Sequence, residues 1–170
     1  LLQHGAAHVK WADAYALACH QFLHYKKGKN VAVLFPYSEN LDAFSDWYIQ
    51  LLAESIGKTK RIGITPTKAM GPKDQHSELQ LFLDGPEDKF FIFIKKRHSP
   101  SRIQNLYDAE YEGVKQAFIK RKKPFAEVSL AELSPEALGE LFFFFELEVA
   151  FLGALLRVNT ENQPAVELSK

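Results

Sequence analysis

Cysteine is almost absent from this sequence of 170 residues, which contains Cys19 alone. A single cysteine excludes an intramolecular disulfide and a cysteine metal cluster within the chain. Chains with so little cysteine are typical of reducing compartments, so the sequence predicts a cytoplasmic protein. Cys19 itself is interpreted as a small buried hydrophobe, because no partner base for a nucleophilic thiol can be identified.

Net charge is also absent, since 21 Lys and Arg residues balance 21 Asp and Glu residues. No overall field would therefore attract nucleic acid or an anionic membrane, and neither is expected as a partner. A basic run, Lys120 to Lys123, precedes Pro124. We interpret that run as a helix end whose lysines complement the helix dipole and face water.

No uninterrupted hydrophobic segment is long enough to suggest a membrane anchor. The most apolar stretch, residues 138–156, contains four consecutive phenylalanines but also Glu140, Glu146 and Glu148. Three carboxylates in one span are costly in hydrocarbon. A helix that is apolar on nearly all sides is instead expected at the centre of a globular core.

Several motifs are missing as well. The chain begins at Leu1 without methionine or a signal-like leader, which suggests that the natural protein begins earlier. No glycine-rich dinucleotide fingerprint or P-loop is present. The pairs His4 with His8 and His20 with His24 have a metal-chelating spacing but lack the HExxH glutamate and a third ligand. We therefore expect neither a metal nor an organic cofactor.

Helical and extended patterns alternate along the chain. Helices are predicted from apolar spacing and end signals, and strands from short apolar runs. Residues 62–66 are interpreted as a short loop-rich segment, and residues 98–102 as a loop. The predicted helices are Trp11–Tyr25, Leu41–Ile56, Gln75–Leu83, Leu106–Lys120 and a long helix capped by Ser134; the predicted strands are Val31–Phe35, Phe90–Ile94 and, more weakly, Phe125–Leu130.

This alternation predicts an α/β fold, a three-layer α/β/α sandwich with a mainly parallel sheet. No linker, repeat or low-complexity tract divides the sequence, so residues 1–170 are expected to form a single domain. Ligands of parallel sheets bind beyond the carboxyl ends of the strands. Chemistry is accordingly expected in the loops after Phe35, around residues 71–73 and after Leu156.

Four residues are candidates for chemistry, although none is decisive alone. Glu54 ends an amphipathic helix, where it can simply pair with Lys58 four residues later. His76 stands where a loop enters a helix, so it can be a local hydrogen-bonding group or a catalyst. Gln163 and Lys170 flank a loop and a predicted helix start near the end of the sequence.

Together these residues lie in segments that match one family in the same order. Residues 51–58 contain Ala-Glu-Ser-x-Gly-Lys, residues 65–71 lead into Asp-Gln-His-Ser at 74–77, and Asp-Gly-Pro-Glu-Asp-Lys follows at 84–89. Residues 153–170 end with Asn159, Gln163, Val166-Glu167 and Lys170. These segments resemble those of glucose-6-phosphate isomerases of the bacterial type, over nearly the whole chain. The similarity is to the carboxyl-terminal part of that family, a sugar-isomerase domain.

The resemblance implies an aldose–ketose isomerase that interconverts glucose 6-phosphate and fructose 6-phosphate through a cis-enediol, in glycolysis and gluconeogenesis. By that resemblance Glu54 is the base that moves a proton between C2 and C1, and His76 opens the sugar ring. Lys170 assists at that step, and Gln163 hydrogen-bonds the phosphate. No cofactor is implied. The likeness also implies a homodimer in which the histidine reaches the partner's site.

The sequence differs from the family pattern at two places and lacks one of the family's domains, and both points bear on the implied activity. Ala165 stands where the family has glycine, so strain is expected if that position has a positive φ. Glu161-Asn162 replaces an aromatic-Asp pair. The family's amino-terminal sugar-isomerase domain, with its phosphate loop and Gly-Gly-Arg segment, is absent from this sequence. We therefore expect the 170-residue chain alone to be inactive. Two alternatives are a stand-alone regulatory domain that binds a sugar phosphate, and a structural protein derived from an isomerase.

Overall fold

The computed structural model describes residues 2–3, 10–96 and 102–167. Its strands form one five-stranded sheet in the order β1-β5-β4-β2-β3, and every neighbouring pair is parallel. The central strands are the apolar runs of the sequence, which suits a sheet covered on both faces. The strands are β1 (Leu2–Gln3), β2 (Val31–Pro36), β3 (Thr65–Lys68), β4 (Lys89–Lys96) and β5 (Phe125–Leu130).

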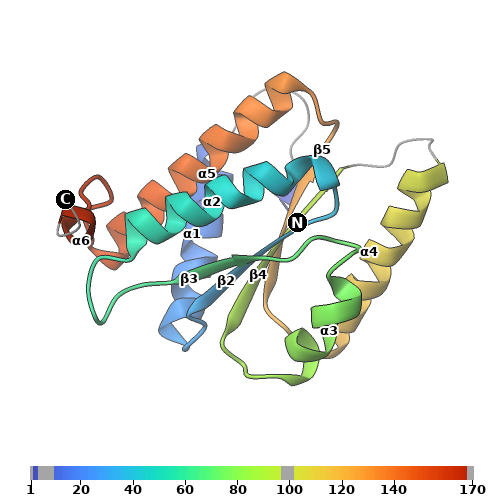
Figure 1. Cartoon of the computed structure of the whole chain (residues 1–170), viewed down its shortest axis with the longest axis horizontal. Helices are drawn as coiled ribbons and strands as arrows, with labels where there is room; N and C mark the ends of the chain where they lie inside the picture. Colours follow the sequence, from blue (N-terminus) through green and yellow to red (C-terminus); the bar gives the residue numbers. More distant parts are fainter. Residues whose placement is uncertain (1, 4–9, 97–101, 168–170) are drawn as a thin grey trace.

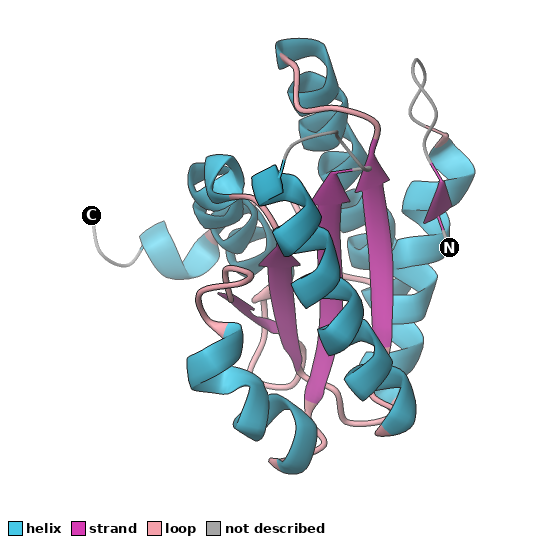
Figure 2. Ribbon diagram, turned by 90° about the vertical axis from the view of Figure 1, so that its right-hand side faces the viewer, coloured by secondary structure: helices cyan, strands magenta, loops and turns pink. Residues whose placement is uncertain are grey.

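Helices cover both faces of this sheet, as Figures 1 and 2 show. One helix layer contains α1, α2 and α5, and the opposite layer contains α3 and α4. The prediction of an α/β/α sandwich with a parallel sheet is thus confirmed. The helices are α1 (Trp11–Lys26), α2 (Asp42–Ile56), α3 (Gln75–Asp84), α4 (Arg102–Lys120), α5 (Pro135–Leu156) and α6 (Pro164–Glu167), with a short 3-10 turn, η1 (Glu39–Leu41).

Alternate residues of each central strand enter different cores. In β2, Ala32 and Leu34 pack towards α1, α2 and α5, whereas Val33 and Phe35 pack towards α3 and α4. This two-residue period is the geometry of an extended chain. All four of these side chains are 0% exposed, so the sheet is the shared wall of two buried cores.

Two predictions about element boundaries are wrong. Residues 65–68 form the edge strand β3 rather than part of a loop, paired with β2 from Val31↔Thr65 to Leu34↔Lys68. The signal was weak because only alternate residues of this strand are even half-buried, and Pro66 interrupts the pattern. The other error concerns α4, which already begins at Arg102 instead of Leu106.

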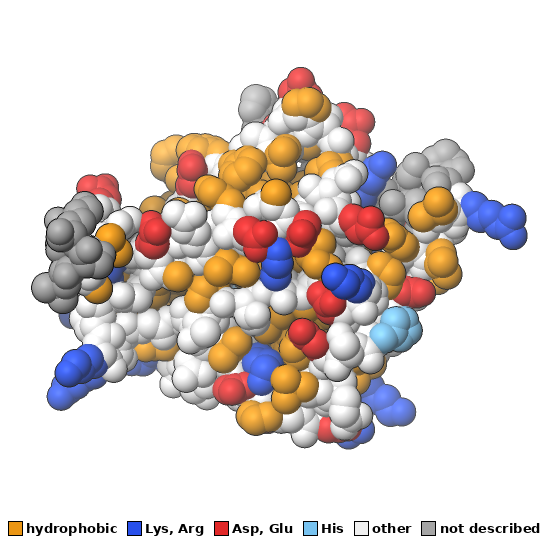
Figure 3. All heavy atoms as spheres, in the orientation of Figure 1, with side chains coloured by type: hydrophobic (Ala, Val, Ile, Leu, Met, Phe, Trp, Pro, Cys, Tyr) orange, Lys and Arg blue, Asp and Glu red, His pale blue; other side chains and the backbone are white. Residues whose placement is uncertain are grey.

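The long helix α5 starts as predicted, because the Ser134 side chain accepts a hydrogen bond from the Ala137 N–H at 3.2 Å. Most of one side of α5 lies in the core, but Phe143 remains 47% exposed. Figure 3 shows hydrophobic side chains gathered over α5 and α2. Within the described ranges, no helix combines the length and hydropathy needed to span a bilayer.

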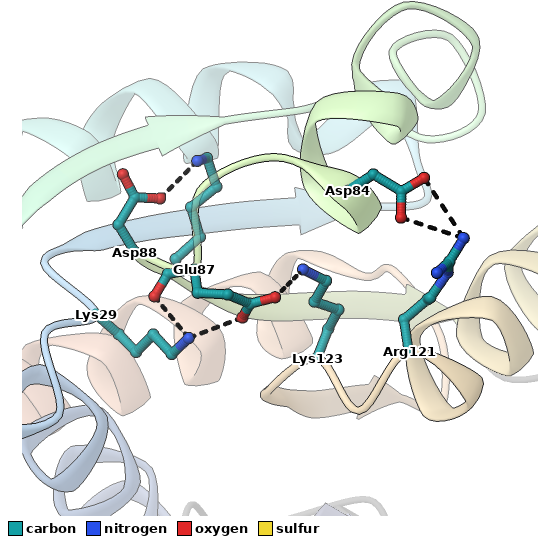
Figure 4. Close-up of polar contacts among 7 residues, drawn as sticks. Lys29, Asp84, Glu87, Asp88, Arg121 and Lys123 are labelled. Carbon is teal, nitrogen blue, oxygen red and sulfur yellow. Dashed lines mark hydrogen bonds and ion pairs between the residues drawn. The ribbon is translucent and has the colours of Figure 1, made fainter.

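A cluster of ion pairs fastens the turns that precede the central strands (Figure 4). Glu87, just before β4, binds Lys29 at 2.9 Å and also pairs with Lys123, which precedes β5. Arg121 pairs with Asp84 at 3.1 Å. The expectation that the run 120–123 simply faces water is therefore wrong for Lys123, which is 7% exposed. Burying its stem becomes favourable because its ammonium group meets a carboxylate.

Candidate functional site

The structure brings together two of the four candidate residues, Glu54 and Gln163. The Gln163 Nε2 group donates a hydrogen bond to Glu54 Oε2 at 2.6 Å, although the residues are 109 positions apart. Gln50, one turn earlier on α2, donates to the other carboxylate oxygen at 3.1 Å. Each oxygen of Glu54 thus has an amide donor, which fixes the orientation of the carboxyl group.

A pocket of about 230 Å³ opens beside this contact. Its wall combines the last turn of α2 with the segment that begins at Gln163, and its lining residues are Ala53, Glu54, Gly57, Lys58, Gln163, Pro164, Ala165 and Val166. Lys58 donates to the backbone oxygen of Asn162, which binds the second wall to the first. The simple pairing of Glu54 with Lys58 is thus replaced by contacts of both residues with the segment after α5.

The candidate site lies near the amino ends of the strands, whereas ligands were expected beyond the carboxyl ends. A helix that follows a parallel strand runs back towards the strand's start, so α2 ends near the amino ends of β2 and β3. A neighbouring pocket of about 650 Å³ shares Ala53 and Gly57 with the first and reaches Asn30, just before β2, and Thr65, the first residue of β3. The loop after Leu156 likewise follows a returning helix. The predicted position of the loop after Leu156, beyond the carboxyl ends of the strands, is therefore wrong.

His76 lies elsewhere, in the first turn of α3, where its side chain is exposed. Helix α3 packs on the sheet face opposite α2, and it follows β3, so His76 is near the carboxyl ends of the strands. The preceding residue anchors this turn. Gln75 accepts a bond from the Tyr37 hydroxyl at 3.0 Å and donates to Glu110 at 2.7 Å. Within one chain, Glu54 and His76 do not share a site.

Two further predictions concern the end of the sequence. Lys170 lies outside the described residues. Ala165 lies inside the helix α6, and the non-glycine residues with positive φ in the described chain are Lys122 and Arg157. The strain expected from Ala165 is therefore not found, because a helical residue carries a β-carbon without penalty.

Several residues that support the site were not identified from the sequence. Gln50 was missed, although its position four residues before Glu54 is a helical pairing distance. Gly153 of α5 was missed because only the fold brings it against the loop that leads to Gln163. A β-carbon at Gly153 would lie 2.2 Å from the Thr160 Cγ2 atom, so glycine is needed for this close approach.

The described residues contain no cluster of three or more His, Cys, Asp or Glu side chains arranged to hold an ion. Of the paired histidines, His4 and His8 lie outside the described residues. His24 stacks on the Phe90 ring with 5.2 Å between centroids. Its partner His20 is exposed.

Comparison with curated proteins gives one consistent set of relatives. The glucose-6-phosphate isomerase of Carboxydothermus hydrogenoformans is 36% identical over 91% of this chain, which corresponds to 39% of that relative. The glucose-6-phosphate isomerase of Methanocaldococcus jannaschii is 36% identical over 88% of this chain and 41% of its own length. The chain thus spans about two fifths of the length of these relatives. No family model matches it.

Solved structures support the same assignment of fold. A hypothetical protein of Thermus thermophilus has a TM-score of 0.79 and 31% identity, covering 94% of this chain and 46% of that protein. A glucose-6-phosphate isomerase of Chlamydia trachomatis has a TM-score of 0.75 at 23% identity, covering 84% of this chain and 33% of that enzyme. The latter likeness is one of fold alone. The chain is therefore homologous to the glucose-6-phosphate isomerases and corresponds to part of such a protein.

Proposed function

We propose that this chain supplies the proton-transfer part of an enzyme that interconverts glucose 6-phosphate and fructose 6-phosphate. The observation that carries the proposal is the Glu54–Gln163 hydrogen bond of 2.6 Å inside a pocket, between two segments singled out by the family resemblance. A solvated surface glutamate would not need a distant loop folded over it. The homology to glucose-6-phosphate isomerases supports the proposal.

In this proposal Glu54 is the base. Moving a proton between C2 and C1 of the sugar requires one group that can take the proton from one carbon and return it to the next, and an oriented carboxylate can do both. Gln163 carries two amide hydrogens, so one can stay on Glu54 while the other contacts a substrate oxygen. The resulting cis-enediol would be stabilised by nearby donors, a task assigned to Lys170.

The remaining role, opening of the sugar ring, is assigned to His76 with Lys170. Because His76 lies on the other face of the sheet from Glu54, one copy of the chain does not supply both groups to one sugar. We therefore include a homodimer of the longer protein in the proposal, with His76 acting in the partner's site. A cytoplasmic location and a lack of cofactor belong to the same proposal.

A regulatory sugar-phosphate-binding domain is the second candidate. It would need the pocket but no proton shuttle. The hydrogen bonds from the two glutamine amides orient both oxygens of Glu54. They favour the isomerase, because simple ligand binding gives no reason to orient a carboxylate in this way.

The proposal can be tested by reconstitution. The chain is mixed with the amino-terminal part of the Carboxydothermus hydrogenoformans enzyme, the part that it does not match, and fructose 6-phosphate formation and C2 proton exchange in heavy water are measured. We expect no turnover from either part alone and measurable turnover from the mixture. Glu54→Gln should abolish the exchange while binding of glucose 6-phosphate is retained.

The matched control is Glu146→Gln, at an exposed glutamate of α5 that does not line the pocket. Its activity should stay near that of the unsubstituted mixture. Undiminished proton exchange in Glu54→Gln would remove Glu54 as the base. Binding of glucose 6-phosphate by the chain with no exchange in any mixture would instead support the regulatory domain.

A further inference from the structure

In the described part of the chain, three buried polar side chains without a hydrogen-bond partner lie in the helix layer that holds Glu54 and leads to Gln163. Gln21 of α1 is 1% exposed, and Tyr48 of α2 and Glu148 of α5 are both 0% exposed. Among the described residues, the Gln21 amide, the Tyr48 hydroxyl and both Glu148 oxygens lack hydrogen-bond partners. Native proteins rarely leave such groups unpaired, so their joint burial needs a physical explanation.

The three side chains belong to helices that pack together in one core. Burial, followed by the charge of Glu148, raises the pKa of Tyr48 well above its usual value, whereas the neighbouring Gln21 amide acts in the opposite direction. Both neighbours are therefore close enough to Tyr48 to influence its hydroxyl. The Tyr48 ring also packs on Phe145, one turn before Glu148, with 4.8 Å between ring centroids. Each of the three helices thus contributes one polar group.

We propose that Gln21, Tyr48 and Glu148 form a buried proton-binding site, which clamps α1, α2 and α5 together while it holds its proton. A neutral carboxyl group offers one O–H donor and one carbonyl acceptor, and the amide and the phenol each offer both. Small rotations of these side-chain ends therefore close a set of mutual hydrogen bonds. Once hydroxide removes the proton, forming water, the carboxylate only accepts and leaves a charge in an apolar core.

The surroundings make this carboxyl group responsive to alkaline pH. Burial raises the pKa of Glu148 to about 8. The sheet residues facing the layer are apolar and include Ala32, Leu34 and Ile92. Burial, and then Lys27 with other neighbouring cations, lowers the pKa of His24 on α1, so His24 is neutral in alkaline solution. Among described residues the buried cation is Lys123, which is committed to Glu87.

The proton-binding site can affect the candidate functional site, because two of its helices carry or precede the residues of the pocket. Tyr48 lies less than two turns before Glu54 on α2, and Glu148 lies on the helix that precedes the Gln163 loop. Loosening the contact between α2 and α5 would separate the two walls of the pocket. The clamp itself does not depend on the proposed isomerase activity.

The test uses the chain itself and a fluorescent reporter. Trp47 of α2 contacts Phe142 of α5 with 4.4 Å between centroids, so a Trp11→Phe background leaves one tryptophan that reports on this contact. Urea unfolding is followed between pH 5 and 9.5. We expect the unfolding equilibrium constant to rise about tenfold per pH unit until roughly pH 8, and then to level off. Trp47 fluorescence of the folded chain should change over the upper part of this range.

Glu148→Gln, which keeps an amide in place of the carboxyl group, should remove this rise. Glu146→Gln, an exposed neighbour on the same helix, should retain it, and so should Cys19→Ala, which removes the only thiol. If Glu148→Gln does not fold, carbon NMR of the Glu148 carboxyl group in the unsubstituted chain decides the question. Ionisation in the usual glutamate range, or an unchanged rise of the unfolding equilibrium constant below pH 8 in a folded Glu148→Gln chain, would overturn the proposal.

Discussion

Arg157 has a backbone conformation that is unfavourable for a residue with a β-carbon. It ends α5 in the left-handed conformation, with φ 58° and ψ 42°, a position that glycine usually occupies. Its N–H group bonds the Ala154 oxygen at 3.1 Å, so the conformation is part of the helix end. The chain accepts this strain in order to direct the following loop towards Glu54.

Replacing this residue is therefore expected to stabilise the protein. Arg157→Gly should raise the free energy of unfolding by about 1 kcal/mol, since glycine adopts this conformation without steric penalty. Thermal unfolding measures the effect. Arg157→Ala keeps the β-carbon and removes the charge, so it should show no such gain. Equal midpoints for the two variants would contradict the explanation.

At Gly153, by contrast, substitution is expected to destabilise the protein. Gly153→Ala places a methyl group against Thr160, and we expect the loop to shift and the protein to lose about 1 to 3 kcal/mol of stability. Urea unfolding gives the loss, and the side-chain amide signal of Gln163 in NMR reports whether its bond to Glu54 survives.

A rescue variant controls for this explanation. Thr160→Ser lacks the methyl group that the new β-carbon would meet, so the double variant Gly153→Ala with Thr160→Ser should recover most of the loss. A double variant as unstable as Gly153→Ala alone would show that the close approach is not the cause.

At this scale, the sequence identified Glu54, His76, Gln163 and Lys170 through a family resemblance rather than through their own spacing. Nothing in the local pattern around Glu54 predicts a donor 109 residues away. Gln50 was within reach of sequence reasoning, because residues four apart share a helix face. Gly153 was not, since its importance depends on a contact that exists only after folding.

Among the elements, β5 and α4 share a buried polar cluster. The Glu127 carboxylate binds Lys115 at 2.7 Å, accepts a hydrogen bond from the Tyr111 hydroxyl, and lies 3.5 Å from Lys95. Burial alone would raise the pKa of Glu127, but Lys115, Tyr111 and Lys95 outweigh it and lower the pKa to about 2. The cluster therefore joins the strand to its covering helix through an ionised group.

This cluster predicts a loss of stability in acid. Because the folded-state pKa of Glu127 is below the usual glutamate value, its contribution is present above about pH 4.5 and disappears as the pH falls towards 2. We expect the loss to be roughly 2 kcal/mol, allowing for solvent at the lysine ends. Urea unfolding between pH 5 and 2.5 measures it. Glu127→Gln should flatten the response, whereas the exposed Glu132→Gln should not; equal slopes for both would contradict this role.

The helices and central strands followed from the sequence because their burial produces clear periods. Strands β2 and β4 are continuous apolar runs, as expected where both faces are covered. Strand β3 was missed since an edge strand needs little apolar surface, and its lysine, Lys68, instead meets Asp42 and Asp46 at 2.7 and 2.6 Å. The pocket lies near the amino ends of the strands, which was not predicted. The rule that ligands bind beyond the carboxyl ends of parallel strands concerns the loops after the strands, not residues at the ends of the returning helices.

For the whole molecule, the separation of Glu54 from His76 predicts how defective copies should behave together. In a symmetric dimer that shares its sites, a Glu54→Gln copy and a His76→Gln copy can form a hybrid with one site free of both changes. Two inactive variants, each reconstituted with the amino-terminal part of a relative and then mixed, should regain about a quarter of the unsubstituted activity, since half of random dimers are hybrids with one intact site.

Isomerase assays before and after mixing provide the measurement. A mixture of two preparations of the same variant is the control and should stay inactive. If the hybrids also remain inactive although subunits exchange, His76 does not act in the partner's site.

The ion pairs around Glu87 have one more consequence, which concerns the alignment of strands. Lys29, Glu87 and Lys123 each stand in the turn before a different strand, respectively β2, β4 and β5 (Figure 4). A slip of one residue between neighbouring strands would move a lysine by about 3.3 Å and turn its strand's side chains to the other face. The Glu87 carboxylate can therefore pair with both lysines only when the three strands are in register. These ion pairs thus favour the correct alignment of β2, β4 and β5 over a slipped one.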